Sequence, residues 1–133
     1  MNAPIDRHLQ IITQQYKGKA HRGVDLRCVD DTTRANLDVT ATEDMEIIRQ
    51  GRDGFGNFYI VGRPVRVGRT QEIKYIHINK TDYPLGKILR NGEAFCRCII
   101  GGNSHSLHLH FETWDAVGHY LSLIHISEPT RPY

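Results

Sequence analysis

Short runs of alternating apolar and polar residues cover most of the chain after about residue 23. The runs are rich in β-branched and aromatic residues, and Gly, Asn, Asp and Pro stand between them. The eight candidate strands are GVDLRCV (23–29), DVTAT (38–42), MEIIR (45–49), NFYIVGRPVRVG (57–68), EIKYIHIN (72–79), KILR (87–90), EAFCRCII (93–100) and SLHLHFETW (106–114). Because no helical period lies between them, the pattern predicts a mainly β single domain, an antiparallel sandwich or barrel-like fold.

The N-terminal segment has a different pattern. Apolar residues at Ile5, Leu9, Ile11, Ile12 and Tyr16 are compatible with a short amphipathic helix over residues 5–17. We therefore expect a lead-in over residues 1–16 that contains such a helix. Further along, DGFGN (53–57) and RNGE (90–93) are typical of tight turns between antiparallel strands.

Composition and charge exclude several classes of function. The chain has 133 residues, 39% of them hydrophobic, and a formal net charge of +2, which is too small to favour nucleic acid as a partner. No apolar run reaches the length of a membrane span, and the first residues do not resemble a signal peptide. If the protein acts outside the cytoplasm, we expect another delivery route, such as phage lysis or a virion, or a longer parent protein.

The three cysteines, Cys28, Cys96 and Cys98, form an odd set that leaves at least one thiol free. This count argues against a disulfide scaffold. Cys96 and Cys98 would share one face of a strand, which favours small apolar core residues over a metal or redox site. The sequence does not assign a further role to any of the three.

The last segment, residues 121–133, has an unusual property at the nucleotide level. LSLIHISEPTR can be back-translated as eleven consecutive codons of a transposon end and adapter used in sequencing libraries. We therefore interpret this tail as adapter read-through, not native protein, and exclude His125 from the candidate site. The native chain would then continue differently after about Tyr120.

Several candidate metal-binding or catalytic residues lie in SLHLHFE, residues 106–112. Side chains alternate faces along a strand, so two imidazoles should project from the same face. On that face we expect Ser106, His108, His110 and Glu112, with Leu107, Leu109 and Phe111 turned into the core. A catalytic zinc ion takes three N or O ligands and keeps a fourth position open, so further ligands must come from elsewhere in the chain.

Two other segments offer such groups. In AHRGVDL (20–26), His21 and Asp25 stand four residues apart, and Gly23 between them allows a sharp backbone path. In YIHIN (75–79), His77 should share a strand face with Tyr75 and Asn79, while the two isoleucines pack inward, namely Ile76 and Ile78.

Taken in order, H-x-x-x-D, the Gly-Asn turn, Tyr-x-His and H-x-H-F-E resemble the lysostaphin-type, LytM-like zinc endopeptidases of bacterial cell walls. The resemblance runs from about Lys17 to Trp114, and it implies a metallopeptidase domain over residues 17–120, truncated at its C-terminus. It further implies one Zn²⁺ bound by His21, Asp25 and His110. His77 and His108 would act as catalytic residues beside the metal. Which of the two is the general base stays open.

The remaining polar residues of these motifs receive supporting roles. We expect Tyr75 and Glu112 to support the site as strand residues and Asn57 to serve its turn. Ser106 stands where the family usually has glycine, and His105 is interpreted as a loop residue without an assigned role.

The resemblance implies a zinc-dependent endopeptidase that hydrolyses peptide crosslinks or bridges of peptidoglycan. A non-catalytic relative that binds the cell wall or regulates another protein is one alternative, and a phage virion-associated lytic component is another. A cupin-type metal barrel also uses H-x-H, but it needs a later histidine that the chain lacks once the adapter-like tail is removed.

Overall fold

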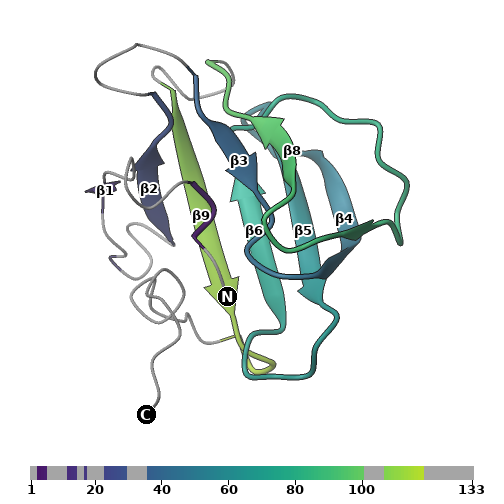
Figure 1. Ribbon diagram of the computed structural model, residues 1–133. Helices are drawn as coiled ribbons and strands as arrows, with labels where there is room; N and C mark the ends of the chain where they lie inside the picture. The colour runs from purple at the N-terminus through teal and green to yellow at the C-terminus, as the bar shows by residue number, and fades with distance from the viewer. Residues whose placement is uncertain are drawn as a thin grey trace.

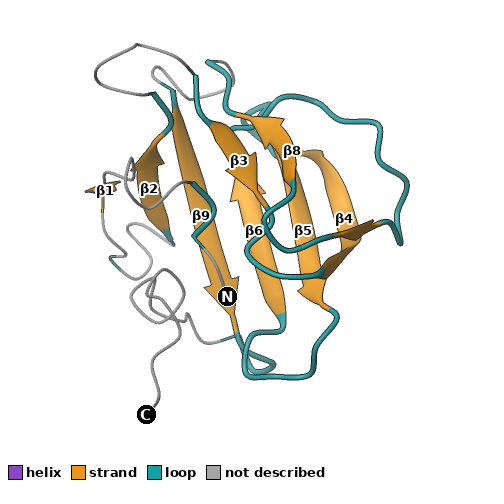
Figure 2. Cartoon of the chain, in the orientation of Figure 1, coloured by secondary structure: helices purple, strands orange, loops and turns teal. Residues whose placement is uncertain are grey.

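A computed structural model describes residues 3–5, 12–14, 17, 23–29, 36–100 and 107–118, and within these ranges the chain forms β-strands and no helix (Figures 1 and 2). The strands are β1 (Ile12–Gln14), β2 (Val24–Arg27), β3 (Asp38–Thr40), β4 (Met45–Arg52), β5 (Phe58–Pro64), β6 (Glu72–Ile76), β7 (Ile88–Leu89), β8 (Ala94–Arg97) and β9 (His108–Trp114). All eight strands predicted from the sequence are present.

The strands form two sheets in which every pairing is antiparallel. The large sheet has the order β1-β2-β9-β6-β5-β4-β7, and the small sheet pairs β3 with β8. Figure 1 shows β3 and β8 in front of the large sheet. The edge strands β1 and β7 do not pair with each other in the described part of the chain, so the large sheet stays open. The mainly β, antiparallel architecture predicted from the sequence is confirmed, without closure into a barrel.

The hydrophobic core lies between the two sheets. Strands of the large sheet contribute every second side chain to it, as the period of two requires, and β9 buries Leu109 and Phe111 completely or nearly so. From the small sheet, Val39 and Phe95 pack against the same cluster. The other face of β9 is left for polar side chains, as the sequence predicted.

The expected N-terminal helix over residues 5–17 is wrong at residues 12–14, which form strand β1. β1 pairs with β2 at the edge of the large sheet, and β-branched Ile12 and Thr13 favour this extended conformation. Further back, Ile5 is fully buried in the core, and the Pro4 carbonyl accepts a hydrogen bond from the Thr40 amide at 2.8 Å. Within the described residues, no helix is long and apolar enough to cross a membrane.

All three cysteines are buried among apolar neighbours, which agrees with the interpretation of Cys96 and Cys98 as core residues. The sequence did not predict that two of them pair: Cys28 and Cys98 form a disulfide, with Cα atoms 6.4 Å apart and a sequence separation of 70. Cys96 remains a thiol, and burial raises its pKa well above the ordinary value. Such a thiol stays protonated and unreactive at neutral pH.

Tyr75 on β6 is the largest polar side chain in the core and ties the two sheets together. Its hydroxyl accepts a hydrogen bond from the Thr42 amide and donates one to the Thr40 carbonyl, both at 3.2 Å between donor and acceptor atoms. Its ring meets those of Phe95 and Phe111 edge to face, with centroids 5.0 and 5.2 Å apart. The end of β3 is therefore anchored to the centre of the large sheet.

We expect Tyr75→Phe to lower the free energy of unfolding by about 1–3 kcal/mol, because the buried Thr42 amide loses its acceptor. Urea denaturation measures the change. Tyr59→Phe is the matched control, since Tyr59 is only half-buried. Equal effects of the two substitutions would contradict an anchoring role for the Tyr75 hydroxyl.

Candidate metal and catalytic site

The pairing of three central strands brings the candidate residues into one row. In the β2–β9 pair, Asp25 lies directly opposite His110, and in the β6–β9 pair Ile76 lies opposite the same histidine. His77 follows Ile76 at the end of β6. The candidate residues therefore converge on the face of the large sheet that points away from the small sheet.

Two carboxylates hold the His110 ring. Its Nδ1 lies 2.9 Å from Asp25 Oδ1, and its Nε2 lies 2.9 Å from Glu112 Oε2. The other Glu112 oxygen accepts a hydrogen bond from the Trp114 indole N–H at 2.8 Å. These three side chains of the site, Asp25, His110 and Glu112, are only 12–14% exposed.

The charges of this cluster are strongly coupled. Burial lowers the pKa of His110, but the hydrogen bonds to Asp25 and Glu112 outweigh it and raise the pKa to about 9. Burial conversely raises the pKa of Glu112, and its bonds to His110 and Trp114 bring it below the ordinary value. The pair of carboxylates therefore favours a positive charge at His110, either as a proton or as a metal ion.

The other two histidines lie beside this cluster. The rings of His77 and His108 have centroids 4.7 Å apart, and those of His77 and His110 have centroids 6.3 Å apart. His108 Nε2 lies 3.9 Å from Asp25 Oδ2, so the two oxygens of Asp25 face two different histidines. The structure thus brings together four of the five residues singled out in the sequence.

The prediction that His77 shares a strand face with Tyr75 is wrong. Tyr75 is fully buried in the core on the opposite side of the sheet, so it does not support the site, and Ile76 lies on the outer face opposite His110. His77 reaches the outer face because its backbone leaves the strand with a φ of 72°. Such a left-handed conformation is uncommon for a residue with a side chain, and it interrupts the alternation of faces.

Two hydrogen bonds hold the His77 backbone in this conformation. The His77 amide donates to the Phe58 carbonyl at 3.2 Å, and the His77 carbonyl accepts from the Ile99 amide at 3.0 Å. Its ring is held in turn by Asn57, whose Oδ1 lies 3.1 Å from His77 Nδ1. The sequence had assigned Asn57 to its turn, and DGFGN contained no direct signal of this second contact.

Several expected residues lie outside the part of the chain that the structure describes, among them His21, His105, Ser106 and His125. Among the residues that are described, no group of three or more His, Cys, Asp or Glu side chains could hold a metal ion. Asp25 and His110 nevertheless offer one oxygen and one nitrogen donor, and Glu112 orients the far side of the imidazole ring, as carboxylates do around metal-binding histidines. Oxygen and imidazole nitrogen are both donor types that zinc accepts.

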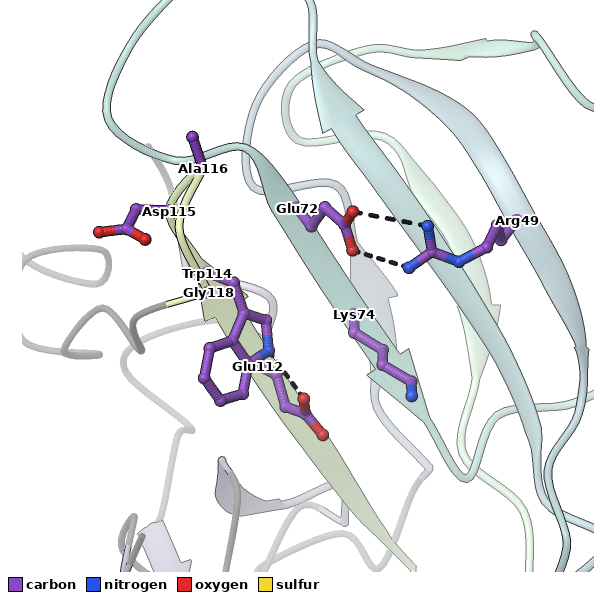
Figure 3. Close-up of a pocket in the computed structure, with 8 residues that line it drawn as sticks. All are labelled: Arg49, Glu72, Lys74, Glu112, Trp114, Asp115, Ala116 and Gly118. Atoms are coloured by element: carbon purple, nitrogen blue, oxygen red, sulfur yellow. Dashed lines mark hydrogen bonds and ion pairs between the residues drawn. The ribbon is translucent and has the colours of Figure 1, made fainter. Parts of the chain in front are cut away.

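A polar hollow of about 450 Å³ adjoins Glu112 on the outer face of the sheet (Figure 3). Its lining comes from β4, β6, β9 and the turn after β9: Arg49, Glu72, Lys74, Glu112, Trp114, Asp115, Ala116 and Gly118. Two of these residues, Arg49 and Glu72, form an ion pair with 2.7 Å between nitrogen and oxygen. The hollow therefore presents both signs of charge and an indole ring next to the residue that orients His110.

Gly23 leaves space for His110. It has a φ of 148°, and a Cβ atom at this position would lie 2.8 Å from His110 Nε2 and 2.7 Å from the Phe111 carbonyl oxygen. Both contacts are too short for a carbon atom. A glycine just before β2 therefore permits the close approach of β2 to β9, in line with the sharp backbone path expected there.

Comparison with known proteins shows the fold. A scan against family models finds no match, and a search of the curated proteins finds none either. Among solved structures, the chain is similar to a zinc-containing peptidase from Vibrio cholerae, with a TM-score of 0.63 and 21% identity over 90% of this chain. The chain spans only 39% of that peptidase.

Two further solved structures match this chain over most of their own length. The structure of the SpoIIQ–SpoIIIAH pore-forming complex matches with a TM-score of 0.73 and 12% identity, over 96% of this chain and 90% of that chain. The catalytic domain of the prophage-encoded M23 protein EnpA from Enterococcus faecalis, in a mutant form, matches with a TM-score of 0.66 and 16% identity, over 90% and 93%. At these identities the likeness shows a shared LytM-like fold.

We expect Gly23→Ala to lower the free energy of unfolding by about 1 kcal/mol or more, because the new methyl group would meet the Phe111 carbonyl oxygen and displace His110. Gly86→Ala is the matched control: it has a φ of +89° with no atom within 4 Å of the added Cβ, so its loss of stability should be smaller. Urea denaturation measures the change in both variants. Equal losses of stability in the two variants would refute the close-approach argument.

Proposed function

We propose that the chain is a zinc-dependent peptidase that hydrolyses peptide bonds in bacterial peptidoglycan. The observation that carries the proposal is the convergence of Asp25, His110, His108 and His77 on one face of the large sheet. These are the residues that the sequence motifs singled out for such chemistry. The similarity in fold to a zinc-containing peptidase and to an M23 catalytic domain supports it.

In this proposal, Asp25 and His110 hold one zinc ion together with His21. Glu112 accepts the Nε2–H of His110, so Nδ1 is the ring nitrogen left for the metal, and this nitrogen already faces Asp25 Oδ1. When bound, zinc acts as a Lewis acid and makes water a nucleophile near neutral pH.

The remaining two histidines, His77 and His108, transfer protons. Burial, together with the charges of His108 and His110, lowers the pKa of His77 to about 4, so its ring is neutral at physiological pH. A neutral imidazole can accept a proton from the attacking water, and a second imidazole, in its protonated form, can donate a proton to the departing amine. His77 and His108 lie close enough to act on the same bond.

Peptidoglycan as the substrate follows from the resemblance of the motifs to cell-wall endopeptidases. The peptide crosslink and the interpeptide bridge are both compatible with it. The site of action would be the cell wall or periplasm, reached by phage lysis, as part of a virion or within a longer protein.

A second candidate function is a non-catalytic module of the same fold that binds a partner. It is favoured by the similarity to the pore-forming complex, which is covered over 90% of its chain at a TM-score of 0.73. Such a module needs neither bound zinc nor proton transfer by His77 and His108. Zinc content and hydrolysis therefore distinguish the two candidates.

We expect His21→Ala, Asp25→Ala and His110→Ala, made in the full-length natural protein, to lose zinc and to stop clearing a suspension of purified cell walls. His108→Ala should keep zinc but lower the rate of clearing by about 100-fold or more, since it removes a proton-transfer group. Metal analysis and the fall in turbidity measure the two properties.

Asp82→Ala is the control, because Asp82 is an exposed carboxylate outside the site. It should match the wild type in zinc content and in clearing. Full clearing by His110→Ala would refute the mechanism. Equal zinc content in all variants would refute the ligand set, and a wild type without either property would favour the partner-binding module.

A further inference from the structure

The β4–β5 hairpin carries an aspartate that only accepts hydrogen bonds. Asp53 Oδ1 accepts from the Phe55 amide at 2.9 Å and from the Asn57 amide at 3.0 Å, while Oδ2 accepts from the Asn57 side-chain nitrogen at 3.0 Å. Burial acts to raise the pKa of Asp53, but these bonds outweigh it and keep the pKa below the ordinary value. The carboxylate is therefore ionised and has no proton to donate.

This carboxylate sets the orientation of the Asn57 side chain. An amide has one end that donates and one that accepts, and only the NH₂ end can face an ionised carboxylate. With Nδ2 turned to Asp53, Oδ1 is turned to His77, where it lies 3.1 Å from Nδ1. Asn57 is 5% exposed, so its surroundings hold this orientation.

The orientation of Asn57 in turn sets the position of the proton on His77. A carbonyl oxygen only accepts, so His77 Nδ1 must be the donor. A neutral imidazole carries a single N–H, and the other nitrogen is then a bare acceptor. Asn57 on the hairpin contacts Nδ1, which leaves Nε2 as the bare nitrogen. Among the described residues, the rings of His108 and His110 neighbour that of His77.

We propose that Asp53 and Asn57 are positioning residues that hold His77 in the Nδ1–H tautomer, with Nε2 as a proton acceptor. The tautomer itself does not depend on the proposed function; its catalytic meaning does. Within that function, the tautomer assigns proton acceptance to His77 and leaves the donor role to His108. The left-handed backbone of His77 serves the same end, because it brings the ring within reach of Asn57.

The test is the ring ¹⁵N spectrum of His77 in the full chain as purified, near neutral pH. Two-bond ¹H–¹⁵N correlations distinguish a protonated from a bare ring nitrogen, and His77→Gln identifies the signal. We expect the wild type to show a protonated Nδ1 and a bare Nε2. Asn57→Ala and Asp53→Asn should both move the spectrum towards a mixture of tautomers, the second by freeing the Asn57 amide to turn over.

Asp44→Asn is the matched control, because the Asp44 carboxylate also accepts a turn amide, that of Asn91 at 2.8 Å, but in a turn other than the β4–β5 hairpin that holds His77. It should leave the His77 signal unchanged. If the wild type hydrolyses cell walls, Asn57→Ala and Asp53→Asn should lower kcat by about 10- to 100-fold with little change in KM.

A protonated Nε2 in the wild type would overturn the proposal. So would an unchanged signal in Asp53→Asn, which retains the size of the side chain and so tests the idea even where Asn57→Ala does not fold. A wild type with the expected tautomer but no hydrolysis would refute the proposed function and leave the tautomer assignment intact.

Discussion

The register between β2 and β9 is the constraint on which the site depends. Because Asp25 lies directly opposite His110, the carboxylate and the imidazole meet without any further loop or helix to position them. A slip of one residue would turn the two side chains to opposite faces and bury a charge in the core. The apolar face of β9, with Leu109 and Phe111 buried, prevents that slip. The core therefore determines the register, and the register assembles the site.

The electrostatics of the site divide its three described histidines into two kinds. His110 lies between two carboxylates that favour a positive charge on it, whereas His77 is half-buried beside other imidazoles and stays neutral. A cation and a proton acceptor can thus coexist within a few ångströms. This division arises from the neighbours of each ring, since the isolated side chains are chemically identical.

Much of the fold and part of the site could be predicted from local patterns. The eight strands were recognisable because a half-buried strand repeats every two residues, and H-x-H on β9 indicated two imidazoles on one face. The β1 strand, the Cys28–Cys98 pair and the position of Tyr75 were missed. Each depends on contacts between segments far apart in the sequence, which local periodicity does not encode.

The sequence by itself determined that β9 would present His108 and His110 from one face, because alternation is a property of a single strand. The tertiary structure alone decided on which side His77 stands. Strand alternation would have turned it into the core with Tyr75, and the left-handed backbone, held by Phe58 and Ile99, turns it to the outer face. Those partners come from two other segments, so only the folded sheet could supply them.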